Sequence, residues 1–392
     1  HADVGGEAPG SMPAHATTVD QEGHRVEPML AVSDGGWHEA FVGPFVSASR
    51  TPWERRGDLD AQMGSNAIAV GRLAELVERE GLERYRALAG ALLAYGQRRM
   101  EAAIGVLPDG DYGFEDVLEL GEQDVAIRVR VQVDGGSLRA DFSGSDPQVA
   151  ANVNAVEAVT RSCLYYAVRV ATDPSIPANG GCYRPLALQA PVGSVVNAQP
   201  PAAVAAGHVE TSQRIADVLL GALAQAAPER VPAASQGTMN NVLVGSDDFA
   251  YYETVAGGQG ARPGRDGQSG IQTGMTNTQN TPIEALHTHY PFRVTAYTLR
   301  RGSGGAGAAG GGDGIRRELR FEAPATLSLM GDRRRHAPWG LAGGEPGATG
   351  EVWLIRASGE RERLPSKVTV DVEPGDRLLV LTPGGGGWGR PA

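Results

Sequence analysis

The pattern of apolar and polar positions divides the chain into a loop-rich start, a helical stretch and a β-rich end. Gly and Pro punctuate residues 1–57 too densely for a helix, which predicts loops and short strands there. From Leu59 to about Met100, apolar residues recur at three- and four-residue spacing, with a break at Gly81. This spacing predicts two helices joined by a short turn.

Strict alternation of apolar and polar residues over 125–133 predicts a half-buried strand, and a tight turn leads into a second strand at Leu138–Phe142. We expect helices near 156–171 and 211–226, and mostly β-structure from Ile315 onward. The regular strand–helix alternation of a doubly wound sheet is missing. The chain is therefore predicted to be α+β, a mixed multi-domain fold with regions at 1–57, 58–310 and 311–392.

Composition narrows the class of protein. The chain carries 35 Lys and Arg against 46 Asp and Glu, and the net charge of −11 argues against a nucleic-acid-binding face. No apolar run approaches the roughly 20 residues that a membrane span needs, and no secretory signal is visible. Two cysteines fit a reduced protein better than a disulfide scaffold, so we expect a cytoplasmic protein.

Several common catalytic motifs are absent or lack their context. The single lysine, Lys367, is not part of a P-loop. The string Gly302-x-Gly304-x-x-Gly307 matches a dinucleotide fingerprint but precedes no helix, so a glycine-rich turn is the simpler interpretation. Neither His-Glu-x-x-His nor Gly-x-Ser-x-Gly occurs.

A small cluster of metal-binding residue types lies at the start of the chain. His1 and Asp3 are two apart, so they share one face of an extended segment, and His24 follows in the same loop-rich stretch. A catalytic divalent metal takes about three such ligands and keeps one position open for water. Solvated surface histidines are the alternative.

Ordered motifs along nearly the whole chain resemble the hydantoinase B/5-oxoprolinase B family. The segments that carry the resemblance are His1–Gly6, Pro9–Pro13, Gln21–Gly23, Asp141–Gly144, Ile176–Gly181, Pro200–Val204, Glu210–Arg214, Tyr252–Glu253, Gly257–Ala261, Asn277–Glu284, Ser303–Gly307, Pro338–Gly340 and Pro383–Gly389.

The resemblance implies the B subunit of a heteromer that opens cyclic amides such as hydantoins and 5-oxoproline. ATP would be bound by a hydantoinase A/5-oxoprolinase A-type partner, and metal-bound water would attack the activated ring carbonyl. One alternative is a subunit of an acetone- or acetophenone-type carboxylase. Another is a non-catalytic remnant that only binds its partner.

The resemblance also implies a metal site, with zinc, manganese or a similar divalent ion as cofactor. In the family the motif reads His-x-x-Asp with a further His some twenty residues on, which Asp3 and His24 match. The first His of the motif would lie before residue 1, so His1 becomes a ligand or a supporting group. We expect the chain to be truncated at its N-terminus.

Further candidates lie in loops punctuated by glycine or proline, where binding residues tend to lie. We expect Glu210, Glu253 and Glu284 to act as acid or base groups. Substrate contacts are expected from Asn179, His208 and Asn277. For each, a hydrogen bond to loop backbone is the competing interpretation.

Overall fold

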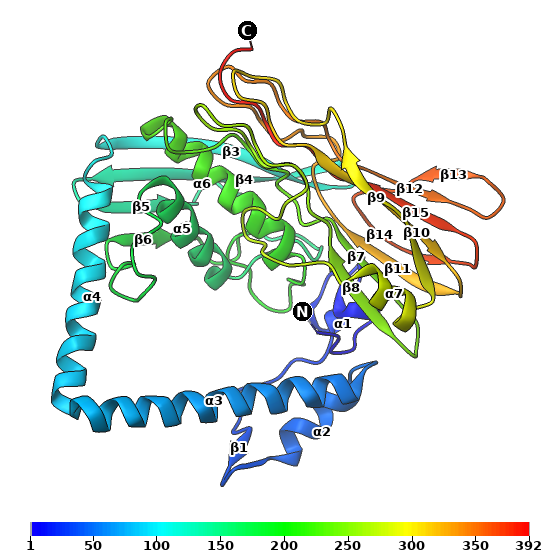
Figure 1. Ribbon diagram of the computed structural model, residues 1–392, viewed down its shortest axis with the longest axis horizontal. Coiled ribbons are helices and arrows are strands. Elements are labelled where there is room, and N and C mark those ends of the chain that lie inside the picture. The colour runs from blue at the N-terminus through cyan, green and yellow to red at the C-terminus, as the bar shows by residue number, and fades with distance from the viewer. Residues whose placement is uncertain (1, 392) are drawn as a thin grey trace.

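The computed structural model describes residues 2–391 and has three main β-sheets flanked by helices, with a long helical arm on one side (Figure 1). A four-stranded sheet has the order β3-β4-β5-β6, antiparallel except for the parallel pair β5 and β6. The bounds of its strands are β3 Gly110–Leu120, β4 Gln123–Asp134, β5 Ser137–Asp141 and β6 Leu186–Gln189.

Two helices, α5 (Glu157–Ala171) and α6 (Ser212–Ala226), pack against this sheet. The predicted alternation in β4 is confirmed, because Val125, Ile127 and the apolar positions that follow them are buried in the first hydrophobic core. In α6, every residue from 212 to 224 is buried. This helix is therefore central to the first core.

The remaining long strands form two sheets around a second core. The four-stranded sheet is β14-β11-β7-β8, and the five-stranded sheet is β13-β12-β15-β10-β9. The first contains β7 Asn241–Gly245, β8 Ala250–Thr254, β11 Ala325–Met330 and β14 Lys367–Val372; the second contains β9 Phe292–Arg300, β10 Gly314–Phe321, β12 Glu351–Ile355, β13 Arg361–Arg363 and β15 Arg377–Leu381. The β-rich end predicted from Ile315 is thus confirmed, as is the α+β class.

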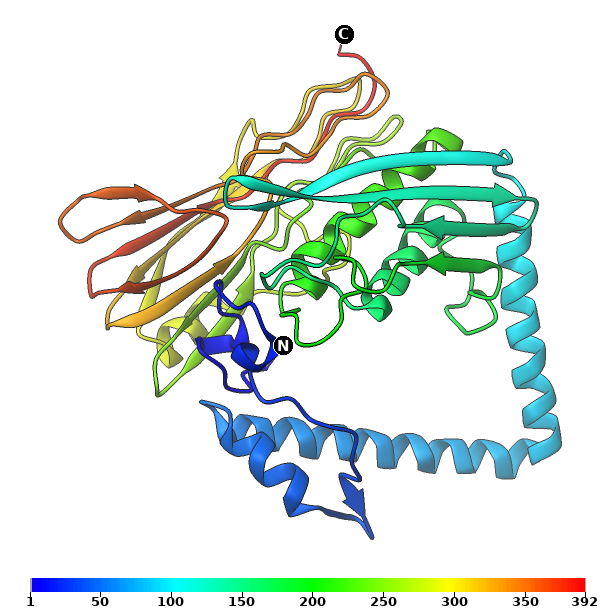
Figure 2. The same ribbon diagram turned by 180° about the vertical axis from the view of Figure 1, so that it is seen from behind.

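A helical arm, formed by α3 (Pro52–Glu80) and α4 (Leu82–Ile104), extends from the body of the protein in both ribbon views (Figures 1 and 2). The two predicted helices and their break at Gly81 are confirmed. All of α3 lies in the described part of the chain, and two of its residues, Arg55 and Leu59, are buried. Apolar side chains such as Ile68 remain 68% exposed.

The start of the chain contains more helix than its Gly and Pro content predicts. Besides β1 (Val32–Ser33) and β2 (Gly36–Trp37), it forms α1 (Val19–Glu22) and α2 (Glu39–Ser47), and α3 already begins at Pro52. Stacked aromatic rings support α2 despite its internal proline. The expectation of loops and short strands is therefore wrong for 19–22, 39–47 and 52–57.

Glycine-rich segments of the C-terminal half pack backbone against backbone. A Cβ on Gly311 would lie 1.9 Å from the carbonyl oxygen of Gly385, and a Cβ on Gly258 would lie 2.0 Å from that of Gly312. This close packing explains why the stretch around 302–312 is rich in glycine without opening a helix.

The predicted boundary between residues 310 and 311 falls between β9 and β10, which pair in one sheet. The first core also takes Met12 from the initial segment and Met330 from the C-terminal region. These contacts cross the predicted boundaries. Where one domain ends and the next begins stays a prediction.

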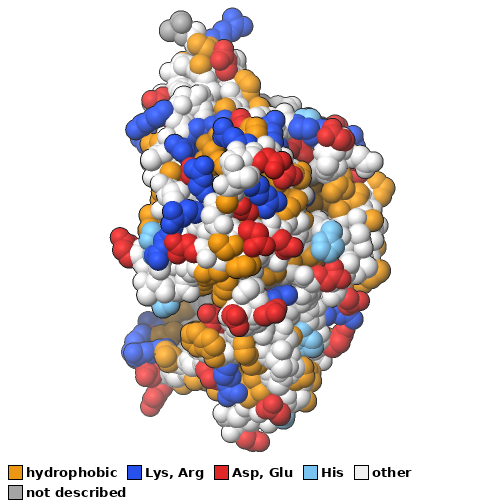
Figure 3. Space-filling model, turned by 90° about the vertical axis from the view of Figure 1, so that its right-hand side faces the viewer, with side chains coloured by type: hydrophobic (Ala, Val, Ile, Leu, Met, Phe, Trp, Pro, Cys, Tyr) orange, Lys and Arg blue, Asp and Glu red, His pale blue; other side chains and the backbone are white. Residues whose placement is uncertain are grey.

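On the side formed by the C-terminal sheets, basic and acidic side chains are intermixed (Figure 3). Glu318, for example, pairs with both Arg316 and Arg377 at 3.0 Å. Within residues 2–391, no helix is long and apolar enough to cross a membrane. Cys163 and Cys182 are both free thiols. The cytoplasmic location stays a prediction.

Candidate functional site

A cavity of about 630 Å³, here called the central cavity, lies beside α6. Cavities of this size are typical of small-molecule sites. Apolar and polar groups share its wall, which includes Tyr166, Val170, Gln213, Asp217, Leu220, Arg230, Ser235, Gly237, Arg262, Arg265, Asp266, Gln272, Thr273, Asn277 and Trp339.

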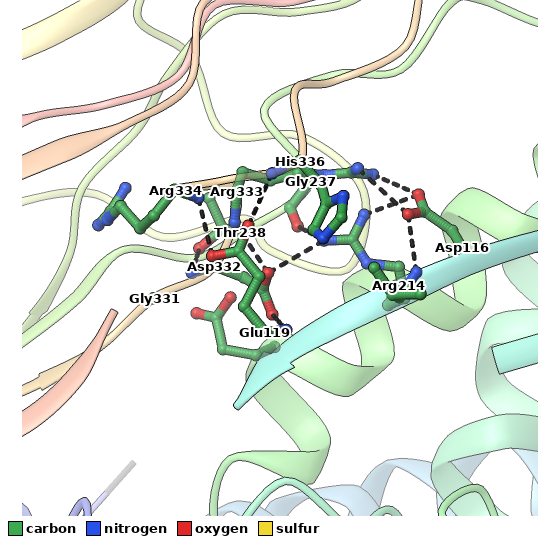
Figure 4. A network of polar contacts seen from close by, with 12 residues as sticks. Asp116, Glu119, Arg214, Gly237, Thr238, Gly331, Asp332, Arg333, Arg334 and His336 are labelled. Carbon is green, nitrogen blue, oxygen red and sulfur yellow. Dashed lines mark hydrogen bonds and ion pairs between the residues drawn. The ribbon is translucent and has the colours of Figure 1, made fainter. Parts of the chain in front are cut away.

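Adjoining the central cavity is a buried network of ion pairs (Figure 4). Arg214 of α6 donates to Asp116 of β3 at 2.9 Å and contacts Asp217 at 3.3 Å. Arg333 donates to the same two carboxylates, at 2.8 and 2.5 Å. Because these residues come from distant parts of the chain, the network joins the first sheet to the C-terminal region.

The network continues through Asp332 to Glu119. Asp332 pairs with Arg214 at 3.5 Å and with Lys367 at 3.6 Å. Glu119 accepts the backbone N–H groups of residues 334–336. Burial opposes ionisation of Glu119, yet these hydrogen bonds leave its pKa below the usual value. One side of the central cavity is therefore held by buried charges as well as by packing.

Glycine is required where the network meets the cavity. Gly237 has φ +62°, and a Cβ there would lie 2.6 Å from Oδ2 of Asp217 and 2.7 Å from Nε of Arg333. A side chain at this position would therefore displace the ion pair.

Glu210 is fully buried in a π-helical turn (Gly207–Thr211) that precedes α6. Its Oε1 accepts the N–H of Met239 at 3.1 Å, whereas Oε2 has no hydrogen-bond partner among the described residues. Burial, assisted by the charge of Asp332, raises the pKa of Glu210 to about 7. A carboxyl with this pKa can exchange protons near neutral pH.

The other two acid candidates have different surroundings. Glu253 of β8 forms a buried two-point ion pair with Arg317, at 2.6 and 2.8 Å, and accepts from Tyr251 and Asn280. Glu284 lies at the start of the short helix α7 (Ile283–His289) and is exposed. None of the three predicted glutamates lines the central cavity.

The predicted substrate-binding residues are dispersed as well. Asn179 accepts two backbone N–H groups of its own turn and donates to the carbonyl of Leu92, which fixes the turn against α4. Asn277 lines the central cavity. His208 lines a separate, open hollow of about 300 Å³ beside α5. The structure thus brings one of these three residues to the central cavity.

The predicted metal ligands do not form a complete set within residues 2–391. Both oxygens of Asp3 are occupied, by three backbone N–H groups and by the guanidinium of Arg50 at 3.1 Å. His24 is exposed, and His1 lies outside the described residues. Among the residues described, no group of three His, Cys, Asp or Glu side chains is placed to hold a metal ion.

The described residues therefore do not fit the expected metal by themselves, and the metal site stays a prediction. Asp3 instead holds the initial loop together. It also lines a smaller cleft of about 210 Å³, which it shares with Tyr251 and Tyr252.

The sequence pattern did not reveal most of the ion network. Asp116 lies in β3, where charged and apolar residues are interspersed, and Arg333 lies in an irregular loop. A signal was available at Arg214 and Asp217, because two charges stand inside an otherwise apolar helix. Buried charges need partners, so that pattern indicates ion pairs but does not say with which residues.

Chemically, the central cavity offers hydrogen-bonding side chains, an apolar wall and three arginines. Such a cavity suits a small polar molecule with an apolar face. Proton exchange near neutral pH is available from Glu210, which lies outside the cavity wall.

Comparison with known proteins gives one consistent result. The family model for hydantoinase B/oxoprolinase matches residues 1–391. The chain is 36% identical to 5-oxoprolinase 1 of Arabidopsis thaliana, over 99% of this chain and 32% of that protein. It is 32% identical to the putative B subunit of a D-/L-hydantoinase from a Pseudomonas species, over all of this chain and 69% of that protein.

Comparison with solved structures agrees with the family match. An ATP-dependent caprolactamase from Pseudomonas jessenii superposes with a TM-score of 0.90 at 28% identity, over 99% of this chain and 70% of that one. Acetone carboxylase superposes with a TM-score of 0.86 at 19% identity, over 99% of this chain and 59% of that one. The second likeness shows the fold alone.

Proposed function

The chain belongs to the hydantoinase B/oxoprolinase family, and from this premise we propose that it is the B-type subunit of an ATP-dependent cyclic amide hydrolase. The observation that carries the proposal is the match along residues 1–391, which includes every segment around the central cavity. The names of the relatives, a 5-oxoprolinase and a hydantoinase, supply the reaction class.

In this proposal the central cavity binds the ring. Val170, Leu220 and Trp339 cover its apolar carbons, and the amide side chain of Asn277 is available to its polar groups. The neighbouring ion network keeps that wall rigid while substrate enters and product leaves. Rigid support of this kind positions a substrate without requiring a new ordering step at each turnover.

Glu210 is the proposed proton-exchanging group. Its pKa of about 7 leaves a mixed population of protonated and ionised carboxyl near neutral pH. Glu210 does not line the central cavity itself, but its turn leads directly into α6, whose Gln213 and Asp217 do. Glu253 stabilises the fold through its ion pair with Arg317.

We assign ATP binding to a partner subunit, and the helical arm to contact with that partner. The arm exposes Ile68, Val70, Leu88 and Leu92, each by more than half of its surface. Two of them lie on α3 and two on α4. The number of exposed apolar side chains on this projecting arm supports its assignment as an interaction surface. Since the hydantoinase relative is named as one subunit of an enzyme, the proposed partner is an ATP-binding subunit of the hydantoinase A type.

A divalent metal stays part of the proposal, with no step assigned to it. Elemental analysis of the full-length protein tests it directly. Close to one equivalent retained after gel filtration supports the metal, and less than roughly a tenth of an equivalent contradicts it.

The functional proposal is tested by co-expressing the full-length protein with its ATP-binding subunit and assaying 5-oxoproline and hydantoin with and without ATP. ATP-dependent release of the open-chain acid, without added bicarbonate, is expected. Turnover that requires bicarbonate identifies a carboxylase instead. If the complex forms and turns over neither substrate class, the chain is a non-catalytic binding subunit.

A further inference from the structure

Two arginines stand side by side on a tight hairpin at the central cavity. Arg262 and Arg265 pair across the hairpin, with N–H to carbonyl distances of 3.1 and 3.0 Å. Pro263 and Gly264 form the turn, and Gly264 has the positive φ of +66° that suits glycine. Directly paired residues of an antiparallel bridge point to the same face, so both side chains project together.

This arrangement places like charges close together without a counter-ion from the protein. No ion pair or side-chain hydrogen bond of Arg262 or Arg265 is found among residues 2–391. Like charges at directly opposed positions destabilise a strand pair. Both side chains are exposed, so water screens much of their repulsion, and a bound anion would add the counter-ion that the described residues do not supply.

Neither acidic group of the cavity forms an ion pair with Arg262 or Arg265 among the described residues. Asp217 is held by two arginines of the ion network. Asp266 accepts the N–H of Gly310 through its Oδ1, which anchors the end of the hairpin. Arg230 adds a third positive charge to the same cavity. The cavity is thus rich in arginine although the chain as a whole carries a net charge of −11.

We propose that Arg262 and Arg265 form a carboxylate-binding site that selects an anionic ligand for the central cavity. Guanidinium groups bind carboxylates through paired, charge-assisted hydrogen bonds. The apolar wall at Val170, Leu220 and Trp339 then covers the body of the ligand. Resting on the proposed function, this makes the substrate a cyclic amide that bears a carboxylate, rather than a neutral lactam.

Calorimetric titration of the full-length protein tests the site without ATP or partner. The probes are 5-oxoproline, 2-pyrrolidinone (the same ring without the carboxylate) and inorganic phosphate. The test variant is Arg262→Gln with Arg265→Gln, and the control is Arg301→Gln with Arg363→Gln, two exposed arginines that do not line the cavity. Circular dichroism confirms that both variants fold.

We expect 5-oxoproline to bind at least about tenfold more tightly than 2-pyrrolidinone, and to lose about 10- to 100-fold in affinity in the test variant only. Equal affinities for the two rings, or an unchanged affinity in the test variant, would overturn the proposal. Arginine-dependent binding of phosphate without preference for 5-oxoproline would also overturn it, and would assign the pair to a phosphate group.

Ring opening by the complex separates this inference from the proposed function. If no cyclic amide is opened while arginine-dependent binding of 5-oxoproline persists, the proposed function fails and the carboxylate site stands. If 2-pyrrolidinone and 5-oxoproline are opened equally well by wild type and test variant, the function stands and the carboxylate site is wrong.

Discussion

At the scale of single residues, the burial of Glu210 changes the pKa of its carboxyl and therefore the pH dependence of stability. Its carboxyl has a pKa of about 7 in the folded chain against an ordinary value of 4.5, so between these pH values it retains its proton only in the folded state. The folded state then binds more protons than the unfolded state. This residue therefore lowers stability progressively as pH rises through that window.

The side chain of the variant Glu210→Gln stays uncharged at every pH, so position 210 in this variant does not lower the free energy of unfolding as pH rises. Its free energy of unfolding relative to wild type should rise by about 2–3 kcal/mol between pH 5 and pH 8. Urea unfolding at several pH values measures the difference, and Glu284→Gln on exposed α7 is the control for loss of one carboxyl. Parallel pH profiles for wild type and Glu210→Gln would show that burial does not raise this pKa.

The buried pair of Glu253 and Arg317 gives a second prediction at this scale. Removing one partner leaves an uncompensated buried charge, so Arg317→Met should cost about 3–5 kcal/mol of unfolding free energy. The exposed pair of Arg72 and Glu75 on α3 is the matched control, and Arg72→Met should cost less than about 1 kcal/mol. Similar losses for both variants would mean that the buried pair adds little.

At the scale of elements, the sequence predicted the helices, strands and turns that depend on the local pattern of apolar and polar residues. The strand predicted at 125–133, which the structure extends to 123–134, the helices α5 and α6 and the break at Gly81 follow from periodicity and turn residues. The exposure of the arm could not be predicted from the sequence. Apolar residues at helical spacing do not show whether the surface that packs against them belongs to the same chain. The ion network was not predicted either, since its members meet only after the sheets have packed.

The glycine-rich segments allow a sharp test of backbone packing. A methyl group at Gly311 would lie 1.9 Å from a carbonyl oxygen, whereas one at Gly310 would lie 3.9 Å from its nearest neighbour. Gly311→Ala should therefore cost about 2 kcal/mol or more, and Gly310→Ala less than about 1 kcal/mol. Urea unfolding measures both variants, and equal losses would contradict the packing described for this region.

The helical arm makes a prediction about association. Replacing Ile68 and Leu88 by Glu should weaken binding of the proposed ATP-binding subunit at least about tenfold, because each substitution would bury an unpaired charge in the proposed interface. The free energy of unfolding should change by less than about 1 kcal/mol, since both side chains are exposed. Gln62→Glu on the same arm is the control. Unchanged affinity, measured by surface plasmon resonance, would place the partner elsewhere.

At the scale of the whole molecule, two hydrophobic cores are joined by buried charges, with the central cavity beside that joint. The chain spans 69% of the hydantoinase subunit and 32% of the plant 5-oxoprolinase to which it is similar. The resemblance predicted the family from many short motifs. Of the predicted site residues, Asn277 lines the central cavity. The sequence motifs could not show which residues would line it, because the cavity forms only when loops distant in the sequence pack together.

The most direct test of the central claim is the ratio of ADP formed to rings opened by the reconstituted complex, with and without this chain. A fixed ratio with 5-oxoproline is expected when both subunits are present, and no ring opening when this chain is omitted. Ring opening that proceeds equally well without the chain would contradict its proposed role as the hydrolytic subunit.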